Sequence, residues 1–453
     1  GWVGCLGADQ VVMGSRPTSG SVARLAATTL AVARPEVAVA HRVVPLLARA
    51  AGAAAEPELQ QAARHIAMRG LLAVETLRRV LRALAQHKGR GMASDLHHTG
   101  PVLLGPDDVR DQAWVLGGGI TYEQPTGDHD VTTVPGWVLP GLVDAHSHIG
   151  LDRHGATDAA TAQQQALTDR SAGALLLRDA GSPADTRWVQ DREDLPRLVR
   201  AGRHIARTRR YIRNYAWEVE PEQLVDQVRI EARSGDGWVK LVGDWIDRES
   251  GDLAPCWPAD VLAQAVAAAH EEGARVTAHC FGEESLRDLA AAGADCVEHA
   301  CGLEPDTIDT FARQGIAIVP TLVNIDTFPQ IAEPAREKFP DYHRHMIDLH
   351  ARRFETIASA REAGIPVYVG TDAGGSLPHG LVADEVAHLG RAGFTPQQAL
   401  DAACWGARAW LGWPGLGEGE EADLVVYPAD PRADLGVLAA PSLVVLRGIA
   451  HIP

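Results

Sequence analysis

Short apolar runs alternate with amphipathic segments through the middle of this chain. The runs at 137–146, 174–179, 204–208, 238–242, 275–279, 296–299, 316–321 and 366–372 have the lengths of buried strands. Between them, apolar residues recur at helical spacing at 221–233, 259–272, 284–292, 305–314 and 343–363. Eight strand–helix units are the number in a (β/α)8 TIM barrel, whose parallel strands close into a ring. The pattern therefore predicts an α/β fold with such a barrel over residues 136–412.

Short strand-like pieces flank this middle segment on both sides. They lie at 102–104, 114–116 and 131–133 before it, and at 422–427 and 442–448 after it. Turn-forming residues separate them, as expected for an antiparallel sheet. We therefore expect a small composite β-sandwich domain, built from residues 92–135 and 413–453, into which the barrel is inserted.

The first ninety-one residues have a different character. They are rich in Ala, Arg and Leu, and the apolar residues between 58 and 86 fall at helical spacing. The run Lys88-Gly89-Arg90-Gly91 carries the stop signals of a helix end. We expect residues 1–91 to form a helical extension that catalysis does not require. A regulatory or oligomerisation role, and a natural start at Met92, stay open alternatives.

Composition and charge exclude several classes of partner. The net charge is −17 over 453 residues, which disfavours nucleic acids and anionic membranes as partners. No uninterrupted apolar run reaches the length of a membrane span. The six cysteines contain no C-x-x-C pair, and we expect reduced thiols in a cytoplasmic protein. The expected partner is a small-molecule substrate, and homo-oligomerisation is left open.

Ligand-type side chains stand at the ends of the apolar runs. His146 and His148 close the first run, and residues two apart in a strand point to the same side. The other run ends add one lysine, two histidines and one aspartate, namely Lys240, His279, His299 and Asp372. Each alone also fits an ordinary role, as a core histidine, a snorkelling lysine or a capping aspartate. Because the strand ends of a barrel converge on one mouth, the series favours a single site for zinc or a similar ion.

These residues lie in motifs that resemble the amidohydrolase superfamily of metal-dependent hydrolases. Within it, the chain is similar to the imidazolonepropionase-like and prolidase-like branch. The resemblance runs from about Val102 to the end. Besides the single lysine and histidines above, it rests on Pro-Gly-Leu-Val-Asp-Ala-His-Ser-His at 140–148, Gly-Thr-Asp-Ala-Gly at 370–374 and Ala-Asp-Leu-Val-Val-Tyr at 422–427.

The resemblance implies a site with two divalent ions, zinc being the expected metal. His146, His148 and Asp372 would hold the first ion, and the second would lie between two further imidazoles, those of His279 and His299. Lys240, carbamylated by carbon dioxide, would bridge both ions. The implied reaction is hydrolysis of an amide or another C–N bond by a metal-bridging hydroxide, with Asp372 as catalytic proton shuttle. A dipeptide, an N-acyl amino acid and a cyclic amide are candidate substrates.

The chain departs from prolidase-like relatives at two places near this site. They often carry Tyr two residues after the fifth-strand histidine, where this chain has Phe281. They also often carry a Gly-Gly-His-type loop after the third strand, where it has Arg210-Tyr211-Ile212-Arg213. Dipeptide specificity is therefore not implied. Tyr211, Arg213 and His379 are candidates for substrate binding, with an ordinary loop role as the alternative.

Two other functions stay open. A mononuclear hydrolase or deaminase of the same superfamily usually has a Glu close after the fifth-strand histidine and lacks the fourth-strand lysine. Here Glu283 stands at an unusual spacing from His279, and Lys240 is present. A non-catalytic, metal-free homologue would be expected to lose ligands, whereas all six ligand positions are filled.

Overall fold

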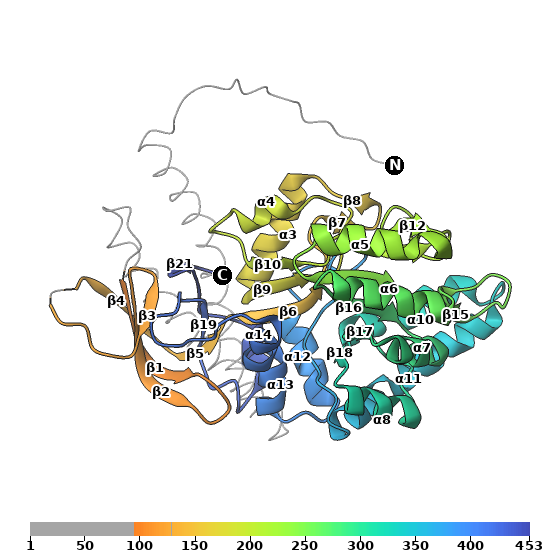
Figure 1. Cartoon of the computed structure of the whole chain (residues 1–453). Helices are drawn as coiled ribbons and strands as arrows, with labels where there is room; N and C mark the ends of the chain where they lie inside the picture. The colour runs from red at the N-terminus through yellow and green to blue at the C-terminus, as the bar shows by residue number, and fades with distance from the viewer. Residues whose placement is uncertain (1–94, 128) are drawn as a thin grey trace, which may run out of the picture. The chain divides into compact units, whose positions relative to one another are not determined.

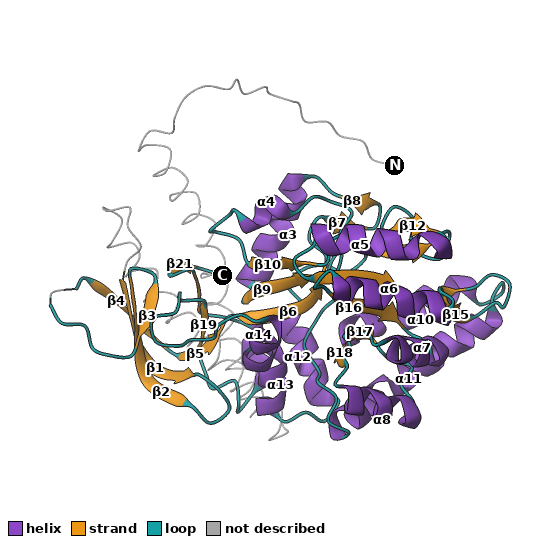
Figure 2. Cartoon of the chain, viewed as in Figure 1, coloured by secondary structure: helices purple, strands orange, loops and turns teal. Residues whose placement is uncertain are grey.

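The computed structural model describes residues 95–127 and 129–453. The predicted helical extension at 1–91 lies outside these ranges and stays a prediction. Figures 1 and 2 show a group of β-strands beside a larger region in which helices surround parallel strands. Within the described ranges, none of the helices combines the length and the apolar character needed to cross a membrane.

One sheet of eight strands combines both ends of the described chain. Its order is β21-β20-β19-β5-β1-β2-β3, with β4 paired alongside β1. The bounds are β1 Asp95–Leu103, β2 Val109–Leu116, β3 Gly119–Thr121, β4 Val131–Pro135, β5 Trp137–Pro140, β19 Leu424–Tyr427, β20 Leu443–Leu446 and β21 Ile449–His451. Because β5 pairs with β19, this sheet extends past residue 135, the boundary suggested by the sequence.

Two parallel sheets form the core of the larger region. Their orders are β10-β9-β6 and β12-β11-β13-β16-β17-β18. The bounds are β6 Leu142–Ser147, β9 Ala174–Asp179, β10 Arg197–Arg200, β11 Ile205–Arg207, β12 Trp217–Val219, β13 Trp238–Val242, β16 Arg275–Cys280, β17 Cys296–His299 and β18 Ala317–Val319. Parallel strands with helices between them confirm the predicted α/β class.

Two irregular stretches link these sheets. β10 and β11, a few residues apart, are two halves of one broken strand. β10 pairs in parallel with β9, and β11 pairs in parallel with β13. Residues 366–373 form only isolated bridges, Ser147 with Ala373 and Ile318 with Val367. The run predicted as an eighth strand, 366–372, is therefore not a regular strand. Its end leaves the extended conformation at Asp372, where φ is 58°.

Twelve named α-helices lie among the described residues. They are α3 Ala159–Ser171, α4 Arg187–Gln190, α5 Leu224–Ser234, α6 Ala259–Glu271, α7 Glu283–Ala292, α8 Pro305–Gln314, α9 Leu322–Ile325, α10 Phe328–Ala332, α11 Pro340–Glu362, α12 Val382–Arg391, α13 Pro396–Ala403 and α14 Trp405–Leu411. Two hairpins, β7 Leu151–Asp152 with β8 Gly155–Ala156 and β14 Asp244–Ile246 with β15 Leu253–Pro255, also lie outside the predicted strand series.

Helix α8 shows how local sequence sets the ends of these elements. Glu304 and Thr307 form a capping box at its start, and Gly315 ends it in the left-handed conformation. The buried residues Ile308 and Phe311 lie three positions apart on one face. This face joins the main hydrophobic core, so the helix is held by packing as well as by its caps.

Gly141 divides the predicted strand at 137–146 into β5 and β6. The first part joins the eight-stranded sheet and the second joins the parallel strands. At the junction, the Gly141 N–H donates to Asp423 O over 2.9 Å. A Cβ at this position would lie 2.5 Å from Cβ of Leu175, so only glycine allows this close approach.

We expect Gly141→Ala to lower the free energy of unfolding by about 1–3 kcal/mol, because the added methyl overpacks the junction against Leu175. Gly105→Ala is the matched control, since nothing lies within 4 Å of its added Cβ. Urea unfolding of both variants measures the difference. Equal midpoints for Gly141→Ala and the wild type would show that the junction has room for a side chain.

Candidate metal centre

The first ligand group lies at the end of β6. His146 Nε2 and His148 Nε2 are 3.1 Å apart. Asp372 Oδ1 lies 3.0 Å from the first and 2.9 Å from the second. Three atoms at these separations match ligands placed about 2.1 Å from one divalent ion. Within the described ranges, these three residues form a group that could hold a metal ion, because their donor atoms all lie within 4.8 Å of one another.

A second pair of imidazoles lies beside this trio. His279 lies near the end of β16, and His299 is the last residue of β17. Nδ1 of His279 and Nε2 of His299 are 2.9 Å apart. The ring centroids of His299 and His146 are 5.3 Å apart, so the two groups are neighbours. The structure therefore brings together the four histidines and the aspartate that the sequence singled out.

Lys240 lies in the middle of β13 and is 1% exposed. Its Nζ atom has no hydrogen-bond partner among the described residues. Burial lowers the pKa of this amine, while the charges of Glu298 and Asp372 oppose that effect. An unpartnered buried amine is costly, so the position calls for a group that the protein alone does not supply.

The imidazoles of His146 and His148 each have their second nitrogen, Nδ1, held on the side away from the centre. His146 Nδ1 lies 2.6 Å from Glu298 Oε2, and His148 Nδ1 lies 2.6 Å from Gly181 O. A carbonyl or a carboxylate can only accept, so these Nδ1 atoms carry the protons. Their Nε2 lone pairs then face the centre, as metal ligation requires.

The second pair follows the same arrangement more loosely. His299 Nδ1 lies 2.6 Å from Thr321 Oγ1, which leaves its Nε2 facing His279. His279 has its Nε2 turned outward, 3.9 Å from Asp244 Oδ1. This Asp244 carboxylate already accepts the backbone N–H groups of Phe281 and Gly282. The donor atoms thus form two neighbouring groups, the trio around Asp372 and this pair of imidazoles.

Glu298 is the buried charge behind His146. It is 0% exposed and pairs with Arg178, likewise 0% exposed, over 2.7 Å. Thr277 also donates its hydroxyl to this carboxylate. Burial opposes ionisation, but Arg178 and His146 hold the pKa of Glu298 well below its usual range. The sequence analysis had not singled out Glu298.

Left-handed backbone conformations occur at the centre. His299 has φ 66°, Thr321 φ 47° and Asp372 φ 58°. For non-glycine residues these conformations cost roughly 1–3 kcal/mol each and are maintained only by surrounding contacts. At His299 the conformation changes where the side chain points. Successive residues of a regular strand face opposite sides, so Glu298 and His299 would normally point apart. Its positive φ lets His299 and Glu298 serve the same centre.

Asp372 is the most accessible of the ligand side chains. Its side chain is 22% exposed, against 1% for His146 and 6% for His148. Burial opposes its charge, but the neighbouring imidazoles of His146 and His148 hold the pKa of Asp372 well below its ordinary value. It is therefore an ionised carboxylate at the open side of the group.

The three predicted substrate residues occupy different positions. Tyr211 lies at the centre, with its ring 5.4 Å from His279 and 4.8 Å from Trp245. Burial, and then the charge of Asp372, raise the pKa of Tyr211 well above its ordinary value, so the phenol is neutral. Arg213 is exposed. His379 is turned to α3, where its Nδ1 lies 2.8 Å from Asp169 Oδ2.

Several residues at the centre lay outside the sequence predictions. They contact ligands or stack on them, and they are Glu298, Thr321, Asn324, Asp244 and His204. His204 is 0% exposed and stacks on His148 at a centroid distance of 5.0 Å. Asp244 and Thr321 stand just after β13 and β18, so a search for polar residues at the ends of apolar runs could have found them. Glu298 and Asn324 have no such signal.

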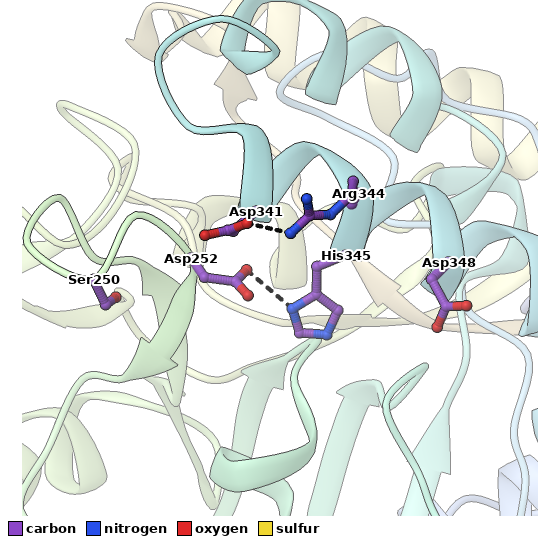
Figure 3. A pocket seen from close by; sticks show the side chains of 6 residues that line it. All are labelled: Ser250, Asp252, Asp341, Arg344, His345 and Asp348. Carbon is purple, nitrogen blue, oxygen red and sulfur yellow. Dashed lines mark hydrogen bonds and ion pairs between the residues drawn. The ribbon is translucent and has the colours of Figure 1, made fainter.

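A separate cleft of about 590 Å³ lies between the β14–β15 loop and α11 (Figure 3). There Asp252 and His345 point toward one another, with Oδ1 and Nδ1 3.0 Å apart. Hydrogen bonding to Glu283 is the main cause that raises the pKa of His345 to about 9. This histidine is thus a cation that joins the loop to α11 and α7. None of the metal-facing residues lines this cleft.

Comparison with known proteins shows the family of this chain. The model of the Amidohydrolase family matches residues 137–449. Uncharacterised proteins of Mycobacterium tuberculosis and Mycobacterium bovis are each 54% identical over 360 residues, covering 79% of this chain and 96% of theirs.

Solved structures share the fold at lower identity. A Xaa-Pro dipeptidase with bound methionine has a TM-score of 0.67 at 21% identity, covering 80% of this chain and 100% of its own. A putative prolidase from Bifidobacterium longum has a TM-score of 0.68 at 23% identity, with coverages of 80% and 95%. The ochratoxinase of A. niger has a TM-score of 0.65 at 18% identity, with coverages of 79% and 96%.

We expect Glu298→Gln to weaken zinc binding about 10- to 100-fold, because Gln cannot supply the charge that orients His146 and neutralises Arg178. Glu271→Gln is the control, since Glu271 is 64% exposed in its pair with Arg229. Competition with a chelator measures the affinity, and circular dichroism checks that the variant is folded. A folded Glu298→Gln protein with wild-type affinity would exclude this role.

Proposed function

The chain belongs to the amidohydrolase family, and from this membership we propose that it is a binuclear metal-dependent hydrolase that cleaves an amide or another C–N bond. The observation that carries the proposal is the convergence of donor atoms. Two groups of imidazoles face each other, with Asp372 beside one and the unpartnered Nζ of Lys240 near both. Zinc is the expected metal, since imidazole and carboxylate donors suit it.

Each side chain has a distinct part in holding the ions. His146, His148 and Asp372 would hold one ion, and the His279–His299 pair would hold the other. Lys240 would bridge them as a carbamate, formed by addition of carbon dioxide to Nζ with loss of a proton. A bare ammonium would repel two cations, whereas a carbamate offers two anionic oxygens.

Bound ions would lower the pKa of water and polarise the scissile carbonyl. The residues of the chain then handle the proton and the substrate. Asp372 Oδ2, the oxygen turned away from His146 and His148, would take a proton from the attacking water and return it to the leaving nitrogen. Tyr211, neutral and beside His279, would donate a hydrogen bond to a substrate oxygen. Arg213 and His379 stay proposed substrate contacts without support from the described geometry.

The substrate is proposed only as a class. The structural neighbours include a dipeptidase, an ochratoxinase, a molinate hydrolase and a phenylurea hydrolase. Phe281 packs at 4.4 Å from His279 and 4.9 Å from His299, so the position two residues after His279 offers no hydroxyl to a peptide. We propose N-acyl amino acids, dipeptides and cyclic amides as the set to screen with the zinc-loaded protein, with no preference for dipeptides.

We extend the proposal to the closure of the barrel and to the other domains of the chain. A closed circuit of neighbouring strands supports a (β/α)8 barrel. It runs from β6 through β9, the broken strand β10–β11, β13, β16, β17 and β18 to residues 366–373, and back to β6. We also propose a composite β-sandwich beside it, a helical extension at 1–91 and a cytoplasmic location. A small-molecule substrate remains the proposed partner.

A mononuclear hydrolase or deaminase is the second candidate. One observation favours it: among the described residues, the trio of His146, His148 and Asp372 is the only group of three or more His, Cys, Asp or Glu side chains whose donor atoms all lie within 4.8 Å of one another. In that case the His279–His299 pair would serve the substrate instead of a second ion. The number of ions per chain separates the two functions.

We expect Asp372→Asn to retain much of its metal but to lose about a hundredfold or more in turnover, because an amide coordinates through oxygen and cannot accept the proton. Turnover would be measured on a substrate identified in the screen, with metal content in parallel. Asp348→Asn is the control, since that carboxylate is 67% exposed. Near-wild-type turnover in a fully metallated Asp372→Asn protein would remove Asp372 from the reaction.

A further inference from the structure

Asn324 contacts the ligand that the proposed reaction depends on. Its Nδ2 atom donates to Asp372 Oδ2 over 2.7 Å, and the residue is only 8% exposed. Asp372 thus has its two oxygens turned to different partners. Oδ1 faces His146 and His148, while Oδ2 is bound by the amide.

The turn that carries Asn324 is itself firmly held. Asn324 lies in α9, which starts after Thr321 in the left-handed conformation. The backbone N–H groups of Leu322 and Val323 donate to the Glu385 carboxylate over 2.8 and 2.9 Å. Glu385 belongs to α12 and is 0% exposed. A buried carboxylate therefore fixes the backbone from which the Asn324 amide reaches Asp372.

The same turn also contacts the second ligand group. Thr321 Oγ1 lies 2.6 Å from His299 Nδ1, three residues before Asn324. On its other side, Asp326 pairs with His388 Nε2 over 2.7 Å and with Arg353 over 2.8 Å. The short segment between β18 and α10 therefore positions one ligand of each proposed ion.

We propose that Asn324 is a positioning residue, which holds Oδ2 of Asp372 so that Oδ1 alone is presented to His146 and His148. This inference rests on the proposed metal centre. A free carboxylate can rotate and coordinate one ion through both oxygens, and a fixed amide donor on Oδ2 prevents that rotation. A neutral donor suits this place, since a second carboxylate would repel Asp372.

The test uses cobalt(II) added to the metal-stripped full-length protein, so it needs no substrate. Chelator competition gives the affinity of the site formed by His146, His148 and Asp372, and visible absorption reports its coordination. Asn324→Leu removes the donor at nearly constant size, and Asn324→Ala removes it without risk of overpacking. Thr310→Val is the control, because the Thr310 hydroxyl donates to Asp306 O within α8 over 2.8 Å and bonds neither Asn324 nor Asp372.

We expect both Asn324 variants to bind cobalt about tenfold more weakly than the wild type, with a shifted visible band. Thr310→Val should match the wild type in both respects. In an Asp372→Asn background, removing Asn324 should cause no further loss, because the two act as one unit.

Wild-type affinity in either folded Asn324 variant would overturn the inference and leave the proposed function intact. An equal tenfold loss in the Asp372→Asn background would also overturn it, since Asn324 would then act through another group. If the wild-type protein itself bound no cobalt, the proposed function would fail, and the inference with it.

Discussion

One buried carboxylate, that of Glu298, joins four parallel strands behind the histidines of the candidate metal centre. From β17 it contacts His146 on β6, Arg178 on β9 and Thr277 on β16. An isolated buried carboxylate would be strongly unfavourable, so this charge is tolerated only because each oxygen has partners. The same bonds fix the proton of His146 on Nδ1 and leave Nε2 free for a ligand. Strand packing and ligand orientation therefore depend on one group.

The rest of the centre repeats this constraint in other forms. An imidazole has two nitrogens, and a fold that presents one must satisfy the other. Gly181 O does so for His148, and Thr321 does so for His299. Local conformations that are unfavourable for ordinary residues, at His299 and Asp372, are maintained by these contacts. The ligand positions are thus properties of the assembled strands, since no single strand contains their partners.

This dependence explains what the sequence could predict. The proposed ligand residues could be singled out because each stands at or near the end of an apolar run, and parallel strand ends lie together. The α/β class followed from the same alternation. Glu298 and Asn324 were missed because their roles depend on which strands become neighbours and on the positive φ of His299. The run at 137–146 was predicted as one strand, because the break at Gly141 arises only from close packing against Leu175.

The metal content of the zinc-loaded protein, measured by elemental analysis after dialysis, tests the central claim most directly. Two groups of donor atoms predict close to two zinc ions per chain in the wild type and close to one in His279→Ala, which removes a donor of the second group only. A ratio near one in the wild type that His279→Ala leaves unchanged, or a ratio near zero, would contradict a binuclear centre.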